Sequence, residues 1–323
     1  MVRTNMRIVQ CIALLLTVGL CGPGFAQVAP PNLTSDFAPP HGVRIAGRFG
    51  ELSWEERLLT ATSKDGLTFE RTHNVITDQA RSPNLVVADG VLYLYYSGAM
   101  NGTGRGALAV AISADRGKTW VFKHVDVRAG DRMMWPYAPD VQVLRDGRFR
   151  LSFSEDIRSP SIFYAEGKDG IHFTSAGTVY SRTGPFGSLM IGSLTVPIGE
   201  DWHAYLRHGN ADDFGFVNHG FSSDGDRFTF AGELKFSDGP HPCHPTSAVS
   251  LGDGSIRFYG SPDETPGGVR SFLTRDGVKF EPEPGMRLAL DLATGVEKDF
   301  VKDAAVARLA DGTYFMVYVT DIP

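Results

Sequence analysis

The sequence predicts an all-β fold, a five-bladed β-propeller built from four-stranded blades. Three observations lead to this prediction: a short turn phrase that recurs about every fifty residues, a second phrase of paired apolar strands that alternates with it, and the near absence of helical periodicity. Repeats of this length that consist of short strands are typical of propeller blades. Each blade is expected to combine one copy of each phrase.

The first phrase is Asp-Gly or Asp-Arg-Gly, followed by a short gap and an aromatic ring. Its copies begin at Asp65, Asp115, Asp169, Asp224 and Asp276. We expect each aspartate to accept backbone N–H bonds inside the turn between the two outer strands of a blade, with the glycine at positive φ. The ring is expected to pack between neighbouring blades. The phrase therefore predicts architecture and not chemistry.

The second phrase is an apolar strand, a turn and another apolar strand, and it occurs at 83–96, 139–153, 192–206, 245–259 and 304–318. Its aromatic and β-branched content is typical of strands, and we expect each copy to form the inner hairpin of a blade. The first unit, 57–72, is an outer strand pair without a hairpin, and the last, 301–320, is a hairpin without an outer pair. Joined across the ring, they would form a composite fifth blade that closes the circle without a disulfide.

The N-terminal segment predicts export. Residues 1–26 combine two arginines, an apolar stretch and a small-residue exit, which is typical of a secretory signal peptide. We therefore expect a secreted protein, periplasmic or extracellular, whose mature chain begins near Gln27. The prolines in 27–46 indicate an extended, poorly ordered leader. Residues 47–323 are then left for the propeller.

Charge and composition narrow the possible partners. The chain has 31 Lys and Arg against 37 Asp and Glu, and the signal segment holds Arg3 and Arg7 but no acid. A mildly acidic mature protein has no electrostatic footprint for nucleic acid. No later stretch is long and apolar enough to span a membrane. Cys243 is the one cysteine outside the signal segment, so we expect no disulfide in the mature chain and a fold that its hydrophobic core stabilises. We also expect a monomer.

Two aspartates are the first candidates for chemistry. Asp140 and Asp303 lie at the N-terminal ends of predicted innermost strands, which surround the central cavity of a propeller. When the five predicted inner strands are aligned on their proline or its equivalent, Asp140 and Asp303 fall at positions two residues apart. Alternate residues of a strand point to the same face, so both side chains are expected to share one strand face. Two carboxyl groups across a sugar bond, one protonated and one ionised, are what glycosidic hydrolysis needs. Alternatively, both aspartates cap strand ends or pair with rim cations such as Arg81, Arg132 or Lys302.

Two short motifs add a family resemblance. Residues 137–141, Tyr-Ala-Pro-Asp-Val, resemble the Trp-Ala-Pro-Asp-Val strand of the five-bladed arabinanase and xylosidase type glycosidases, glycoside hydrolase family 43, in which the aspartate tunes the pKa of the acid. Residues 302–306, Lys-Asp-Ala-Ala-Val, resemble the Asp-Pro-Ser-Val strand of that family, with alanine in place of proline. The resemblance implies a glycosidase with Asp303 as general base and Asp140 as modulator or acid.

The acid of that family has no counterpart here. It is a glutamate two residues before a blade proline, and the matching positions hold Arg81, Tyr137, Met190, Cys243 and Lys302. The acid would have to come from elsewhere on the same rim, and we expect Glu155 or Asp156 to supply it. The missing glutamate also favours an alternative, a non-catalytic propeller that binds carbohydrate.

Polar and aromatic residues at the blade ends are candidates for binding a carbohydrate. A ring on the loop that holds Trp135 and Tyr137 can stack on a sugar. The full set of expected binding residues is Arg81, Asn84, Trp135, Tyr137, Arg158, Arg207, His208 and His244.

A second resemblance supports a different glycosidase. Residues 113–120 match the sialidase Asp box, or BNR repeat, and the other four turn phrases resemble degenerate copies. This implies a sialidase-like exo-glycosidase as an alternative, with Arg81, Arg158 and Arg207 on the substrate carboxylate and Tyr137 or Tyr164 as nucleophile, although sialidases of this repeat type have six blades.

A histidine pair leaves a metal site open. His241 and His244 flank Cys243, and such side chains can hold zinc or copper in a lyase or oxidase. We favour a cavity-lining His244 without a transition metal. No cofactor is expected, apart from an optional structural Ca²⁺ at the axis.

Overall fold

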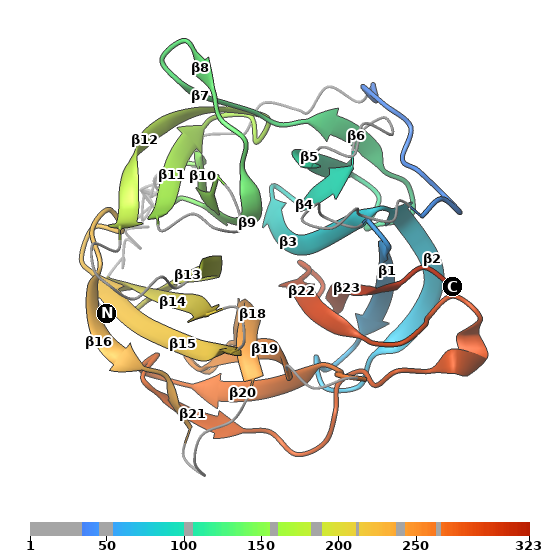
Figure 1. Cartoon of the computed structure of the whole chain (residues 1–323). Helices are drawn as coiled ribbons and strands as arrows, with labels where there is room; N and C mark the ends of the chain where they lie inside the picture. Colours follow the sequence, from blue (N-terminus) through green and yellow to red (C-terminus); the bar gives the residue numbers. More distant parts are fainter. Residues whose placement is uncertain are drawn as a thin grey trace, which may run out of the picture.

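The computed structural model describes residues 34–44, 54–99, 106–155, 161–181, 189–210, 213–236, 243–262 and 266–323. These residues form five sheets arranged around a central axis, which confirms the predicted five-bladed propeller (Figure 1). The one helical element of these ranges is a short 3-10 turn, Leu292–Thr294. No helix in them has the length and hydrophobicity that a bilayer requires.

Four blades are contiguous in sequence and antiparallel. Blade I comprises β3 (Ala80–Ala88), β4 (Val91–Ala99), β5 (Gly106–Ser113) and β6 (Val121–His124). Blade II comprises β9 (Tyr137–Val143), β10 (Phe149–Ser154), β11 (Ser161–Gly167) and β12 (His172–Ser181). Blade III comprises β13 (Leu189–Ile198), β14 (Asp201–Asn210), β15 (Asp213–Ser222) and β16 (Thr229–Glu233). Blade IV comprises β18 (Cys243–Ser250), β19 (Ile256–Pro262), β20 (Arg270–Thr274) and β21 (Lys279–Pro282).

Blade V is the composite blade that closes the ring. Its strands are β22 (Lys302–Arg308), β23 (Tyr314–Asp321), β1 (Glu56–Ser63) and β2 (Glu70–Asp78), in the spatial order β2-β1-β23-β22. The pairing of β1 with β23 runs without a register shift from Glu56 opposite Asp321 to Ser63 opposite Tyr314. Figure 1 shows the blue strand β1 beside the red strand β23 in this blade. The predicted closure by strand pairing is confirmed, and Cys243 is buried and forms no disulfide among the described residues.

Three short strands extend two blades in a way the sequence did not predict. β7 (Asp126–Ala129) pairs in parallel with β12 and forms a hairpin with β8 (Arg132–Met133), which projects from the ring in Figure 1. β17 (Lys235–Phe236) pairs in parallel with β21. Both pairings cover the outer edge of a blade, which limits unwanted strand addition.

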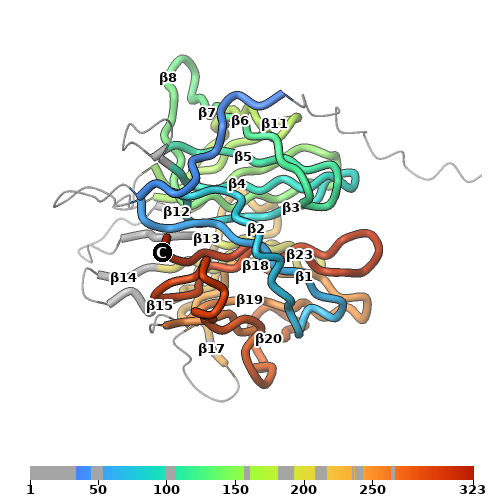
Figure 2. The backbone as a smooth tube through the Cα atoms, turned by 90° about the vertical axis from the view of Figure 1, so that its right-hand side faces the viewer, coloured from blue at the N-terminus to red at the C-terminus, as the bar shows by residue number. Residues whose placement is uncertain are grey.

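The described part of the leader, residues 34–44, packs against the propeller. Phe37 lies 5.8 Å from Phe122 and 4.8 Å from His124 between ring centroids. Asp36 forms an ion pair with Lys123. Figure 2 shows this blue segment along the side of the ring. One apolar ring and one ion pair thus hold the described part of this segment against blade I, whereas residues 27–33, 45 and 46 lie outside the described ranges, so the poor order of the leader as a whole stays a prediction.

The five aspartate turns have the geometry expected of structural turns. Asp65 Oδ1 accepts from Leu67 N and Thr68 N, both at 2.8 Å, and the same pattern recurs at the other four turns. Each turn glycine has positive φ, between 69° and 83°. Trp120 packs on Phe315 of blade V with ring centroids 6.1 Å apart. These carboxylates are therefore occupied by their own turns.

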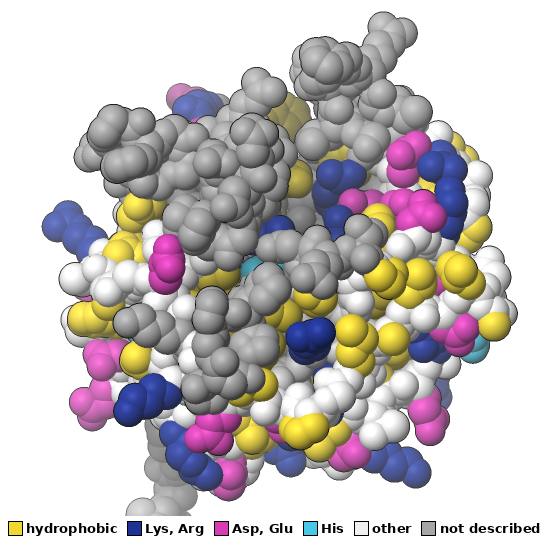
Figure 3. All heavy atoms as spheres, turned by 60° about the horizontal axis from the view of Figure 1, so that its bottom comes forward, with side chains coloured by type: hydrophobic (Ala, Val, Ile, Leu, Met, Phe, Trp, Pro, Cys, Tyr) yellow, Lys and Arg dark blue, Asp and Glu magenta, His cyan; other side chains and the backbone are white. Residues whose placement is uncertain are grey.

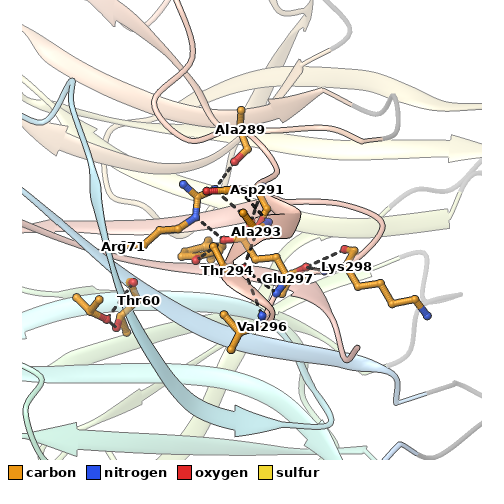
Figure 4. Close-up of polar contacts among 12 residues, drawn as sticks. Thr60, Arg71, Ala289, Asp291, Ala293, Thr294, Val296, Glu297 and Lys298 are labelled. Carbon is orange, nitrogen blue, oxygen red and sulfur yellow. Dashed lines mark hydrogen bonds and ion pairs between the residues drawn. The ribbon is translucent and has the colours of Figure 1, made fainter.

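Hydrogen bonds to Glu297, which is 3% exposed, stabilise the connection from blade IV to blade V (Figure 4). Its carboxylate accepts from Arg71 Nε of β2 at 2.5 Å and from the Tyr318 hydroxyl of β23 at 2.7 Å. It also accepts from the backbone N–H of Asp291 at 2.9 Å. One buried carboxylate thus links the first strand pair, the last strand and the connection between them.

Candidate functional site

A cavity of about 300 Å³ lies where the inner strands converge, and all five blades contribute to its lining. This volume is at the lower end of ligand pockets, which span roughly 300 to 1,000 Å³. Its lining residues with an ionisable side chain are Glu56, Arg81, Tyr137, Tyr205, Arg207, His244, Lys302 and Asp303. Five of the sequence-predicted site residues therefore meet in one place: Arg81, Tyr137, Arg207, His244 and Asp303.

A β-bulge changes the direction of side chains in three of the inner strands, next to the cavity. In blades I, II and V the pairing register shifts at this point, and one residue adopts left-handed φ: Ser82 (52°), Ala138 (50°) and Asp303 (50°). The backbone N–H of Asp303 donates to Ser261 Oγ of blade IV at 2.9 Å, and that of Ala138 donates to Ser97 Oγ of blade I at 3.2 Å. Bulges re-aim side chains next to functional sites, and here the bulge turns Asp303 toward the cavity.

Asp303 is held as a carboxylate. Its Oδ1 lies 3.2 Å from His244 Nε2, and about a fifth of the side chain, 21%, stays exposed. Burial opposes ionisation, but His244, Lys302 and Arg207 outweigh it and keep the pKa of Asp303 well below its usual value. The group is therefore ionised over the whole neutral range.

Glu56 is a second cavity carboxylate, and the sequence analysis missed it. It is 9% exposed, with Oε1 2.9 Å from Lys302 Nζ and Oε2 3.2 Å from Arg81 Nε. Arg81 also lies over the Trp54 ring, 5.0 Å from its centroid. The order of strands in the composite blade is the signal from which Glu56 could have been predicted. Because β1 and β22 both pair antiparallel with β23, they run in the same direction and begin at the same rim.

Tyr137 and His244 complete the polar lining. Burial raises the pKa of the Tyr137 hydroxyl, and Arg81 opposes this rise, so the hydroxyl keeps its proton. The charges of Glu56 and Asp303 also raise its pKa. His244 Nε2 lies 3.2 Å from Arg207 Nη1 as well as from Asp303. The site thus has an ionised acceptor, a protonated hydroxyl and an imidazole between a guanidinium and a carboxylate.

Asp140 lies outside the cavity lining, which corrects the expectation that it shares a face with Asp303. It is 1% exposed, and its Oδ2 accepts from Thr195 N at 2.7 Å and Thr195 Oγ1 at 2.5 Å in blade III. Burial raises its pKa to about 6. The inserted bulge residue breaks the two-residue alternation on which the expectation rested. Asn84, at the equivalent position of blade I, likewise accepts from Val141 N of the next blade at 3.0 Å.

The other predicted site residues do not line the described cavity. Asn84 is buried between blades I and II, Trp135 is 52% exposed between β8 and β9, and Glu155 pairs with Arg132 at the end of β10. Tyr164 packs under Arg150, 5.1 Å from its guanidinium carbon. Asp156, Arg158 and His241 lie outside the described residues. His208 belongs to β14, opposite Phe216, and its side chain is outside the description.

No metal centre forms among the described residues, where no group of three His, Cys, Asp or Glu side chains is placed to hold an ion. His244 instead contacts Arg207 and Asp303. A structural Ca²⁺ stays a prediction.

The fold is shared with crystallised glycoside hydrolases. The chain is similar to a family 43 α-L-arabinofuranosidase from Clostridium thermocellum, with 15% identity and a TM-score of 0.53 over 72% of this chain and 80% of the other. It is similar to an endo-1,4-β-xylanase from Bacteroides thetaiotaomicron, with 15% identity and a TM-score of 0.55 over 75% and 90%. A glycosyl hydrolase from Bacteroides ovatus gives 14% identity and a TM-score of 0.55 over 92% and 93%.

At these identities the likeness establishes the fold alone. The sequence matches no protein-family model and no curated protein. The likeness to family 43 glycosidases is therefore a likeness of five-bladed architecture.

Proposed function

We propose that this protein cleaves a glycosidic bond in an oligo- or polysaccharide that enters the central cavity. The observation that carries the proposal is the ionised Asp303 in a cavity that also holds a second carboxylate, Glu56. Glycoside hydrolysis uses two carboxyl groups in different protonation states. The likeness in fold to glycoside hydrolases from several bacteria supports the proposal.

Each residue has a role that follows from its contacts. Asp303 acts as the base that accepts a proton from water, and His244 orients it through the 3.2 Å contact. Glu56 is the second carboxyl group, because it is the other acidic residue among the described lining residues. Tyr137 and Arg207 supply hydrogen bonds to sugar hydroxyls. Glu155 and Asp156, the acids expected from the sequence, remain alternatives for the role of Glu56, and a tuning role for Asp140 remains a prediction.

Export belongs to the proposal as well. The segment 1–26 supports secretion to the periplasm or the exterior, where polysaccharides are available.

A non-catalytic carbohydrate-binding propeller is the second candidate. Both oxygens of Glu56 are engaged, one by Lys302 and one by Arg81. A carboxylate that contacts two cations is a poor proton donor, and this favours binding without turnover.

The test is a glycan panel with binding and reducing-end release measured on the same samples. Asp303→Asn should lower turnover by about 10²- to 10⁴-fold, the range of a general base, and Glu56→Gln should also lower it. Asp253→Asn, an exposed aspartate of blade IV that pairs with Arg275, is the matched control and should behave as wild type. Full turnover by folded Asp303→Asn would remove the assignment. Binding without product from any glycan would favour the second candidate.

A further inference from the structure

A groove of about 600 Å³ lies between the outer strands of blade V and the Asp115 turn of blade I. We call it the interblade groove. Strand β1 begins at the cavity with Glu56 and reaches the groove at Thr62. An extended strand rises about 3.3 Å per residue, so the two sites lie about 20 Å apart along β1. Figure 2 shows the turns that follow β1 and β22 on the side of the ring away from the C-terminus.

The wall that blade V contributes changes from apolar to polar along its length. Near the cavity, Leu58 and Ile76 belong to the hydrophobic core between blades V and I. Farther along β1 and β2, the side chains that line the groove are Thr60, Thr62, Glu70, Thr72 and Asn74. Burial favours apolar side chains wherever two blades pack together. The polar row therefore marks the part of this interface that stays open.

A bulge in β2 shapes the polar row. The register between β1 and β2 shifts at this point, and His73 adopts left-handed φ of 59°. Thr72 Oγ1 donates to the carbonyl of Thr60 at 3.1 Å and accepts from the backbone N–H of Asn74 at 3.3 Å. Bulges and non-glycine residues with strained backbones are enriched next to binding and active sites. The bulge is thus a second feature, besides the open volume, that is typical of a site.

The opposite wall is fixed by contacts between blades I and V. Gly117 of the Asp115 turn lies so close to the Phe315 ring that a Cβ atom would clash with it. Arg116 of the same turn pairs with Asp311 and donates to Thr313 Oγ1 at 3.2 Å. Phe315 and its neighbour Tyr314 also add aromatic surface to the lining. The groove thus has a preformed second wall and both polar and aromatic surface.

The lining has the chemistry that a sugar chain requires. The side chains of Thr62, Thr68, Glu70 and Asn74 form no hydrogen bond or ion pair with another described residue. Their hydroxyl and amide groups both donate and accept, and the carboxylate accepts. Sugar hydroxyls also donate and accept, and the C–H face of a sugar ring packs on aromatic surface. Such a lining suits a carbohydrate better than an apolar ligand.

A broad charged surface is a different way to hold a polymer. On the face shown in Figure 3, acidic and basic side chains are interspersed among the described residues, so that face offers no extended patch of one charge. Local sites are then what can hold a polysaccharide.

We propose that the interblade groove is a second carbohydrate-binding site, which holds a stretch of polysaccharide outside the cavity. A sugar bound about 20 Å from the cavity cannot reach its carboxylates, so the groove binds without cleaving. If the cavity cleaves the same polymer, a step that rests on the proposed function, two contacts on one chain raise the local concentration of substrate at the cavity. The groove should therefore strengthen binding of long chains and leave short oligosaccharides unaffected.

Affinity electrophoresis of the mature protein tests the groove. The gels contain soluble arabinan, arabinoxylan, galactan or β-glucan, which are neutral, so Lys64 and Lys118 of the lining cannot retain them by charge. Reducing-end release from short oligosaccharides of the same sugars tests the cavity separately. Retention by at least one of the four polysaccharides is expected.

Variants of the polar row show whether the groove is responsible. Thr62→Ala/Asn74→Ala should weaken the affinity for that polysaccharide about ten-fold, the loss of one of two linked contacts, and Glu70→Ala should weaken it as well. Thr174→Ala/Thr229→Ala, at exposed strand positions of blades II and III, is the matched control and should be retained as wild type. Asp303→Asn should also be retained. Thermal melts confirm that each variant is folded.

The outcomes separate the two proposals. Absence of retention by all four polysaccharides, or equal retention of wild type and both groove variants, overturns the second site, while release from short oligosaccharides leaves the proposed function standing. Retention that the groove variants lose, together with no release from any oligosaccharide by wild type, supports the second site and overturns hydrolysis. Groove variants that cleave oligosaccharides normally and polysaccharide slowly support both.

Discussion

Replacement of Asp140 by asparagine separates a structural role of this residue from a catalytic one. Asp140 is buried between blades II and III, where its Oδ2 accepts two hydrogen bonds from Thr195. Asparagine has the same shape and retains one oxygen for these donors. Blade I already has an asparagine, Asn84, at the equivalent position. The substitution therefore removes a buried charge and keeps the main contacts between the blades.

The magnitude follows from the pKa. Burial raises the pKa of Asp140 from 3.8 to about 6, against the hydrogen bonds from Thr195 and Gln142. This difference corresponds to about 3 kcal/mol. Because the folded pKa lies above the unfolded one, the stabilisation by protonated Asp140 is complete below pH 3.8 and is lost as the pH rises through 6. The free energy of unfolding of Asp140→Asn should therefore rise by about 3 kcal/mol relative to that of wild type as the pH increases between those limits.

The assay is urea unfolding of both proteins across this range, with the free energy of unfolding extrapolated to water. Groups present in both proteins cancel in the difference, including Asp321, whose pKa burial and Glu56 raise to about 6. A difference that stays constant with pH would refute the argument. Turnover of folded Asp140→Asn should stay close to wild type, because Asp140 does not line the cavity. Loss of turnover would instead support the tuning role that the family resemblance implies.

Three further substitutions have defined outcomes. Glu297→Ala leaves the guanidinium of Arg71 without its buried partner and should cost about 3 to 5 kcal/mol in urea unfolding; an unchanged midpoint would show that the link is dispensable. Burial and His203 lower the pKa of His219 to about 4, so wild type loses stability as the pH falls from 6.5 through 4. His219→Gln should make this loss of stability smaller in an acid titration followed by fluorescence. Ser261→Ala removes the acceptor of the Asp303 N–H and should lower kcat with a loss of about 1 to 3 kcal/mol in stability; an unaltered kcat would show that the bulge holds Asp303 without this bond.

The blades could be predicted because their signals are local and repeated. The five turn phrases each specify an aspartate, a glycine and a ring, and these residue types act through short-range hydrogen bonds and positive φ. The composite blade followed from the order of the phrases along the chain. In contrast, β7 and β17 are short strands whose parallel pairing partners, β12 and β21, lie far along the sequence, and no local pattern marks them. β8 pairs only with the neighbouring β7 and extends its hairpin.

The candidate site was predicted in part, and the bulge explains the error. Ser82, Ala138 and Asp303 adopt left-handed φ although none of them is glycine. Nothing in serine or alanine indicates such a conformation, because the neighbouring blade imposes it through hydrogen bonds such as the one that the Asp303 N–H donates to Ser261 Oγ. The alternation of side chains was therefore counted across an irregularity that only tertiary structure reveals.

Closure of the ring and assembly of the site depend on the same strand pair. Glu56 comes from the first strand, β1, whereas Asp303 and Lys302 come from β22 near the end of the chain. Strand β23 lies between them, and Glu56 is paired with Asp321 in its register. The pairing spans almost the whole propeller sequence, and contacts of such high sequence separation form slowly. The two cavity carboxylates are thus brought together by the pairing that completes the fold, so a partly closed chain would present Asp303 without Glu56.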